Sequence, residues 1–172
     1  MGSVRYSVAC SLDGYIAGPT GEYDWIIVDP DIDFGALFSR YDAMLIGRRS
    51  YEVLQAGEGD GGGFDMEKFV FSRTLDPAEH SDVTVVAEDA GDFVRELKRR
   101  DGKDVWLFGG GELFRSLLAE GVVDGIEVAV IPILLGGGIP LLPSPADRVR
   151  LRLEDRRIYE ATGTVWLDYA ID

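Results

Sequence analysis

Cysteine, histidine and basic residues are scarce in this sequence. Cys10 and His80 are each the sole residue of their kind, and 17 lysines and arginines stand against 31 acidic residues. A single cysteine excludes an internal disulfide bond and suits a reducing compartment. A single histidine in a polar loop argues against a histidine-based site, so no metal is expected. The net charge of −14 argues against nucleic-acid partners, which need a basic surface.

Long hydrophobic runs are also missing. No segment reaches the length of a membrane-spanning helix, and residues 1–10 lack the charged and apolar regions of a signal peptide. We therefore expect a cytoplasmic protein without a membrane partner. The 172 residues, of which 46% are hydrophobic, are enough for a single domain over residues 1–172 with a substantial core.

The most informative stretch is residues 105–118, VWLFGGGELFRSLL. Four apolar residues predict a buried strand, three glycines follow, and apolar residues at positions 113, 114, 117 and 118 predict a packed helix. Glycines let a backbone or a ligand approach closely, and the N–H groups that start the helix could hold a phosphate. Such a turn serves tight packing as often as ligand binding. The P-loop signature is absent because Glu112 stands where lysine is needed, and position 114 is not the third glycine of G-x-G-x-x-G.

Apolar runs and helical spacing outline the other elements. Strands are predicted at residues 4–10, 43–46, 69–71, 83–86, 105–108, 125–131, 151–159 and 164–171, and helices at 31–41, 92–100 and 113–118. The polar, glycine-rich segment 55–63 is predicted to be flexible. Strands that alternate with helices and end in a hairpin indicate an α/β fold, with a mostly parallel central sheet, flanking helices and an antiparallel C-terminal edge.

A second junction between a strand and a helix is basic. The strand at 43–46 leads into Gly47, Arg48, Arg49 and Ser50. Arginine can grip a phosphate through two parallel hydrogen bonds, so this junction is a candidate anion site. The alternative is an ordinary solvated helix start, and for these four residues alone that alternative is favoured.

Five motifs in register link the sequence to a known family. They are SLDGYIAG at 11–18, LIGRRSYE at 45–52, VFSR at 70–73, LFGGGELF at 107–114 and PILLGGGIPLL at 132–142. Together they cover nearly the whole chain, and it resembles the dihydrofolate reductase superfamily. The resemblance is closer to the branch that includes the reductase domain of bacterial riboflavin biosynthesis, here as a stand-alone member. It implies a dihydrofolate-reductase-like three-layer α/β fold and an oxidoreductase that uses NADPH.

The resemblance also implies which residues bind the cofactor. The glycine-rich turn, with a cis bond between the first two glycines, would carry the pyrophosphate, and a side chain at its second or third glycine should impair cofactor binding more than folding. The GRRS segment and the VFSR motif would hold the pyrophosphate and the 2′-phosphate. Residues 13–24 resemble a loop that closes over the nicotinamide. The implied cofactor-binding residues are Ala9, Ile16, Gly18, Gly47, Arg48, Arg49, Ser50, Ser72, Arg73, Gly109, Gly110, Gly111, Glu112 and Leu113.

The substrate is less well defined. Asp31 lies where folate-reducing relatives keep a catalytic carboxylate, Asp29 and Asp33 are rivals, and all three could equally be helix-start acids that suit the dipole. The PILLGGGIPLL motif points instead to reduction of a ribosylamino-pyrimidine at C1′, with a bound substrate phosphate. The alternatives are a dihydrofolate or pterin reductase, and a non-catalytic NADPH-binding domain.

The apolar strand at 125–131 predicts an oligomer. Its edge has almost no charge to discourage pairing with another chain, and riboflavin-type relatives are dimers through this region. We therefore expect a symmetric homodimer that uses residues 125–135 and the loop that follows. The alternative is that the terminal hairpin covers this strand within one chain.

Overall fold

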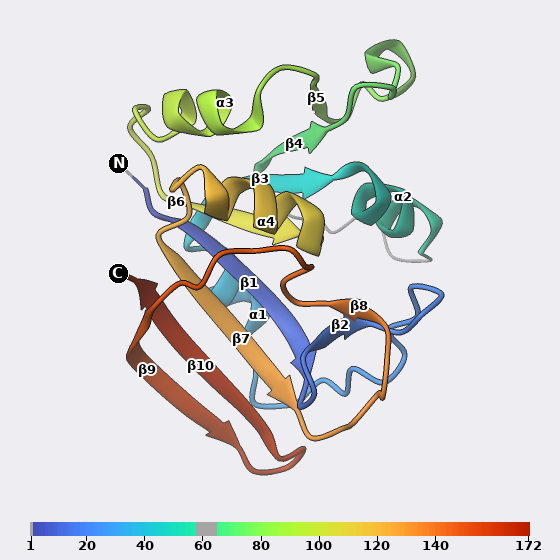
Figure 1. The fold of residues 1–172 in the computed structure, drawn as a ribbon, viewed down its shortest axis with the longest axis vertical. Helices are drawn as coiled ribbons and strands as arrows, with labels where there is room; N and C mark the ends of the chain where they lie inside the picture. Colours follow the sequence, from blue (N-terminus) through green and yellow to red (C-terminus); the bar gives the residue numbers. More distant parts are fainter. Residues whose placement is uncertain (1, 58–64) are drawn as a thin grey trace.

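The computed structural model describes residues 2–57 and 65–172, so most of the segment predicted to be flexible lies outside the described residues. Eight strands form one sheet in the order β5-β4-β3-β6-β1-β7-β10-β9 (Figure 1). Neighbours from β5 to β7 in this order are parallel, whereas β10 is antiparallel to β7 and β9. The strands are β1 (Val4–Ser11), β3 (Tyr41–Gly47), β4 (Glu67–Phe71), β5 (Thr84–Val86), β6 (Asp104–Gly109), β7 (Gly125–Ile131), β9 (Leu151–Tyr159) and β10 (Thr164–Ile171). The predicted mostly parallel sheet with an antiparallel C-terminal edge is confirmed.

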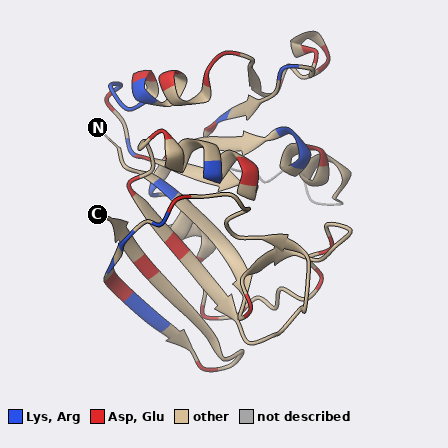
Figure 2. Cartoon of the chain, in the orientation of Figure 1, with Lys and Arg blue, Asp and Glu red and all other residues tan. Residues whose placement is uncertain are grey.

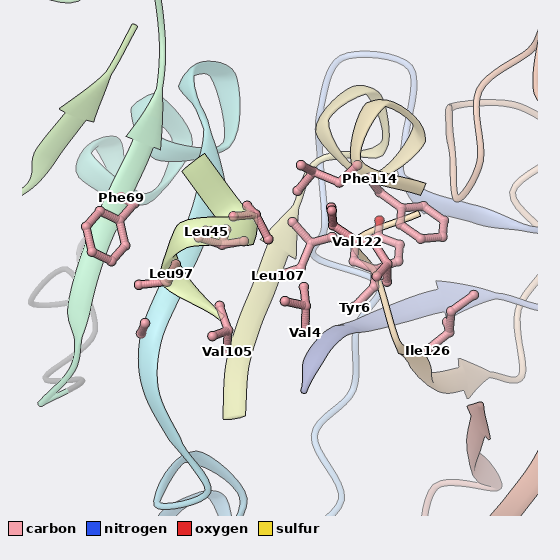
Figure 3. Close-up of a cluster of buried hydrophobic side chains, with 14 of the residues drawn as sticks. Val4, Tyr6, Leu45, Phe69, Leu97, Val105, Leu107, Phe114, Val122 and Ile126 are labelled. Atoms are coloured by element: carbon pink, nitrogen blue, oxygen red, sulfur yellow. The ribbon is translucent and has the colours of Figure 1, made fainter. Parts of the chain in front are cut away.

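Helices form a layer on each face of this sheet. They are α1 (Phe34–Phe38), α2 (Arg48–Ala56), α3 (Ala90–Leu97) and α4 (Gly111–Ala119), with a short 3-10 helix at Pro77–Glu79. On one face, Phe114 and Leu117 of α4 join Val94 and Leu97 of α3 in a core with the strands, much of which Figure 3 shows. None of the helices in the described part of the chain combines the length and apolar character that crossing a membrane requires.

The opposite face of the sheet has its own aromatic core. Trp106 of β6 lies there, while its neighbour Leu107 belongs to the core under α3 and α4, because successive side chains of a strand point to opposite faces. The ring of Phe38 in α1 stacks on Trp106 with centroids 4.8 Å apart. Tyr51 of α2 is buried in the same cluster. Both faces of β6 are therefore buried, as its apolar run predicts.

One predicted helix is much shorter in the structure. The spacing of apolar residues predicts a helix over residues 31–41, but α1 covers only Phe34–Phe38 and Tyr41 already begins β3. Asp33 caps the helix, since its Oδ1 accepts a hydrogen bond from the Ala36 N–H at 2.9 Å. The boundary reflects tertiary packing, because Tyr41 is buried beside Trp106 as a strand residue.

Strand β7 is paired along both edges. It pairs with β1 from Arg5↔Gly125 to Ser11↔Ile131, and with β10 on its other side. The prediction that this strand leaves an edge open for a second chain is therefore wrong. The physical reason is that the terminal hairpin folds back along this strand within one chain, as the alternative hypothesis predicts. The outer strand is β9, where closely spaced charged residues discourage edge pairing.

A buried ionic network joins three neighbouring strands. Glu127 of β7 is fully buried, and its Oε1 accepts hydrogen bonds from Arg5 Nε at 2.8 Å and Arg40 Nη2 at 2.7 Å. Arg5 also contacts Asp168 of β10, and the Tyr41 hydroxyl donates to Glu127 Oε2 at 3.3 Å. Burial is the main reason that the pKa of Tyr41 is raised, and the Glu127 charge adds to it. The network links the start of β3 to the C-terminal half of the sheet.

Candidate functional site

Two helices begin side by side at the carboxyl ends of two neighbouring central strands. Strands β3 and β6 are neighbours, and α2 and α4 start directly where they end. The N-cap residues, Gly47 and Gly110, provide no side chain to cap the first N–H groups. A Cβ on Gly47 would lie only 3.4 Å from the Gly109 carbonyl oxygen and 3.6 Å from the Gly110 nitrogen. Two uncapped helix N-termini thus meet at one place, an arrangement that suits an anion.

The first two glycines of the turn have different structural roles. Gly109 has φ of +108°, and a Cβ there would lie 3.0 Å from the ring of Tyr6, so glycine is needed for the backbone. Gly110 is in an extended conformation, and a Cβ there would lie 3.1 Å from Ser50 Oγ and 4.0 Å from Ile16 Cδ1. It would occupy the space between the two helix starts. The peptide bond between Gly109 and Gly110 is cis, as the resemblance implies.

Gly111 and Gly110 should respond differently to a methyl group. A Cβ on Gly111 would lie 2.8 Å from the Pro140 carbonyl oxygen and 2.9 Å from Pro143 Cδ, so overpacking should lower the free energy of unfolding by about 1–3 kcal/mol. Gly110→Ala fills the space between the helix starts, and we expect normal stability with about tenfold weaker NADPH binding. Thermal unfolding and calorimetric titration of both variants test this. Equal stability of the two variants would contradict the distinction.

Three arginines also lie at the carboxyl ends of the strands. Arg48 and Arg49 occupy the first turn of α2, and Arg73 follows β4, whose last residue Phe71 pairs with Gly47. All three side chains are exposed. Arg48 donates to Glu52 at 2.7 Å and contacts the Thr74 hydroxyl, which links the two junctions. Figure 2 shows this basic character at the start of α2 and after β4.

Ser72, Glu112 and Leu113 have mainly local roles in the structure. Ser72 is buried, and its Oγ accepts hydrogen bonds from the N–H groups of Thr74 and Leu75, so it shapes the turn that presents the next residue. Glu112 lies in the first turn of α4 and pairs with Arg115 at 2.6 Å. Leu113 packs against the core.

The C-terminal end of β1 leads into a small second sheet. Strands β2 (Tyr15–Ala17) and β8 (Ile139–Pro140) pair antiparallel, so two segments predicted as loops support each other. Ala9 lies within β1 opposite Ala129, and Ile16 of β2 reaches toward Gly110. Gly18 is buried, and its N–H donates to the Glu22 carbonyl at 2.8 Å. Ile16 therefore lies beside the glycine turn, whereas Gly18 lies against Gly138 of the loop after β7.

The Asp13 side chain links two loops beside the candidate site, a role that its local sequence does not predict. Its carboxylate accepts hydrogen bonds from the N–H groups of Leu135 and Gly136 at 3.1 and 2.7 Å, and from Ser11 Oγ at 2.6 Å. The Ser11 bond is the main reason that the pKa of Asp13 is lowered to about 2. Asp13 anchors the glycine-rich loop after β7 to the turn after β1. The Asp-Gly pair in SLDGYIAG signals a turn, but not its distant partner.

The three candidate acids differ in their surroundings. Asp29 is buried and accepts hydrogen bonds from the Asp31 N–H and from Thr162 N and Oγ1, all at 2.9–3.0 Å. These bonds, first the one from Asp31, lower the pKa of Asp29. Asp33 caps α1, whereas the Asp31 side chain is exposed. Among the described residues, no group of three or more histidine, cysteine or acidic side chains is placed to hold a metal ion.

The sheet topology and the paired helix starts at its edge define a dihydrofolate-reductase-like α/β protein. Residues 3–167 match the RibD C-terminal domain family, and the chain belongs to this family. It is 31% identical over 173 residues to the uncharacterized protein YyaP of Bacillus subtilis. The alignment covers 94% of this chain and 91% of that protein. The expected family and fold are thereby confirmed.

Solved structures give the same result for the fold. A putative riboflavin biosynthesis protein from Shewanella has a TM-score of 0.86 at 24% identity, covering 99% of each chain. A deaminase/5-amino-6-(5-phosphoribosylamino)uracil reductase from Thermotoga maritima has a TM-score of 0.70 at 19% identity, covering 99% of this chain and 57% of that one. Dihydrofolate reductase from Enterococcus faecalis, complexed with NADP(H), has a TM-score of 0.72 at 13% identity, covering 99% and 96%.

Proposed function

We propose that this protein is an NADPH-dependent reductase of a nitrogen heterocycle of the pyrimidine or pterin type. The observation that carries the proposal is the meeting of the α2 and α4 N-termini beside three exposed arginines. A dinucleotide with a 2′-phosphate presents two groups of negative charge, and helix N-termini and arginines are the groups that bind them. The space that a Gly110 Cβ would fill is where a pyrophosphate fits.

The residues divide into three tasks in this proposal. The N–H groups that start α2 and α4 hold the pyrophosphate, and the arginines, with Arg73 first, hold the 2′-phosphate. Ala9, Ile16 and Gly18 flank the nicotinamide and exclude water from it. When bound, NADPH supplies the hydride. Reduction of a C=N bond also needs a proton at nitrogen, and Asp31 is the exposed acid proposed to deliver or orient it.

A screen of NADPH oxidation against pterins and ribosylamino-pyrimidines tests the proposal. For a substrate that is turned over, Asp31→Asn should lower kcat by about a hundredfold and leave the Kd for NADPH unchanged. Asp33→Asn is the matched control, because the Asp33 side chain caps α1 and has no proposed role in proton delivery. An equal fall of kcat in both variants would contradict the role of Asp31. Tight NADPH binding without turnover of any substrate would favour the alternative of a non-catalytic NADPH-binding domain.

We also propose a homodimer, now through a sheet face rather than through the edge of β7. Cross-strand neighbours share a face, and β9, β10 and β7 align apolar residues there. The rows are Ile158, Val165 and Val130, and Leu153, Tyr169 and Ile126. Among the described elements in Figure 1, no helix lies over β9 and β10. Ile158 and Leu153 are 65% and 44% exposed.

Burial of this face against a second copy should make the protein a dimer at micromolar concentration. Ile158→Glu, which places a charge in the face, should yield a folded monomer whose unfolding temperature no longer depends on protein concentration. Thr84→Glu, on the far edge strand β5, is the control and should remain dimeric. Light scattering decides the matter, and a wild-type monomer that NADPH does not change would contradict the proposal.

A further inference from the structure

Acidic and basic residues are separated at the carboxyl ends of the strands, where the candidate site lies. The six charged residues between Tyr6 and Ser39 are all acidic, and residues 132–146 contain no charged residue. These segments form β2, β8, α1 and their loops, next to the C-terminal end of β1. The arginines of the cofactor side lie beyond β6, after β3 and β4. Figure 2 shows basic colour at the start of α2 and none along β2 and β8.

Three arginines approach these segments, and each is engaged. Arg115 of α4 donates to the Ser144 carbonyl at 3.2 Å and pairs with Glu112 at 2.6 Å. Arg40 follows α1, but its Nη2 lies 2.7 Å from the fully buried carboxylate of Glu127. Arg157 of β9 lies 4.8 Å above the ring of Tyr159, and its charge contributes to the lowered pKa of Asp29. A phosphate on this side would have to displace one of these interactions.

Aromatic rings extend from the core toward the same side. Phe38 stacks on Trp106, and the row continues to Phe34 on α1 and Phe108 on β6, with centroids 5.7 and 5.3 Å from their neighbours. Phe108 directly precedes Gly109, so the row ends beside the glycine turn. Aromatic rings pack well against planar heterocycles, and this packing needs no charge on the ligand.

We propose that the substrate is a planar heterocycle without a phosphate group, either neutral or cationic. This inference rests on the proposed function, because it assumes that the arginine side is taken by the cofactor. A phosphate dianion is bound by arginines, lysines or free N–H groups. Beside Asp29, Asp31 and Asp33 it would instead meet charges of its own sign. The substrate would thus differ from the phosphoribosyl compound named for the Thermotoga relative.

The test measures anion binding with the cofactor site filled. Ribose 5-phosphate is titrated calorimetrically into the protein alone and into the protein saturated with NADP⁺. We expect weak binding to the free protein, abolished by NADP⁺, because the cofactor occupies the arginine side. In a second titration of the NADP⁺ complex, 5-amino-6-(5-phosphoribosylamino)uracil should bind at least about tenfold more weakly than its dephosphorylated form, or not at all.

The outcomes separate this inference from the proposed function. Saturable binding of ribose 5-phosphate to the NADP⁺ complex, lost in Arg40→Ala or Arg157→Ala, would overturn the inference alone. Equal or tighter binding of the phosphorylated pyrimidine would do the same. Failure of NADP⁺ itself to bind would overturn the proposed function and the inference together. Binding of the dephosphorylated pyrimidine to the complex, together with no binding of either phosphate compound, supports the inference.

Discussion

Arg73→Ala is expected to weaken NADPH binding by about ten- to a hundredfold and to leave NADH binding unchanged. Arg73 is exposed at the carboxyl end of β4, beside the start of α2. A hydrogen bond between two charged groups contributes about 1.5–3 kcal/mol, and only the 2′-phosphate of NADPH offers this partner. Calorimetric titration of both cofactors measures the effect.

The control for this substitution lies at the opposite end of the same strand. Arg100 pairs with Glu67, the first residue of β4, at 2.9 Å. Arg100→Ala removes the same charge from the protein, and both cofactors should bind as they do to the wild type. Equal losses of NADPH and NADH affinity in Arg73→Ala would contradict the assignment of the 2′-phosphate to this residue.

Glu127→Gln is expected to lower the free energy of unfolding by about 1.5–3 kcal/mol, the range for hydrogen bonds to charged groups. Glu127 is fully buried and balances Arg5, whose side chain is also largely buried, as well as Arg40. In the variant Arg5 keeps its contact with Asp168 and Arg40 is partly exposed, so the main loss is that of the charge-assisted hydrogen bonds to the buried Glu127 carboxylate. Urea denaturation of the purified variant measures the loss.

Glu96→Gln is the matched control for Glu127→Gln. Glu96 pairs with Arg99 on the exposed side of α3, where water solvates both partners. An exposed pair of this kind contributes little to stability, so the variant should unfold like the wild type. A Glu127→Gln protein as stable as the wild type would show that the network does not hold β1, β7 and β3 together.

Much of the fold and part of the site could be predicted from local sequence. The run Val105–Phe108 and the three glycines after it predict the end of β6 and the start of α4, because burial and backbone freedom are properties of those residues themselves. The GRRS junction likewise predicts the start of α2 and its charge. The proposed cofactor residues come from the family resemblance, and Asp31 comes from its distance along the chain to Gly47. Their roles stay predictions.

The structural roles that the sequence did not predict depend on distant partners. Asp13 anchors Leu135 and Gly136, which are more than a hundred positions away, and Asp29 binds Thr162. No spacing along the chain encodes such a pair, because the hydrogen bond exists only after both segments have folded. The same limit applies to Glu127. The sequence shows only one charged residue in an apolar strand, and the folded structure brings Arg5 and Arg40 to it.

The sequence by itself determined the alternation of strands and helices, the glycine turn and the acidic, cysteine-poor character of the protein, because these depend on neighbouring residues or on composition. Only the tertiary structure decided that residues 31–41 hold a five-residue helix, that β10 covers the edge of β7, and that Arg40 is engaged by the buried Glu127. These features depend on which segments meet in space, and packing between distant segments overrides local preference where the two disagree.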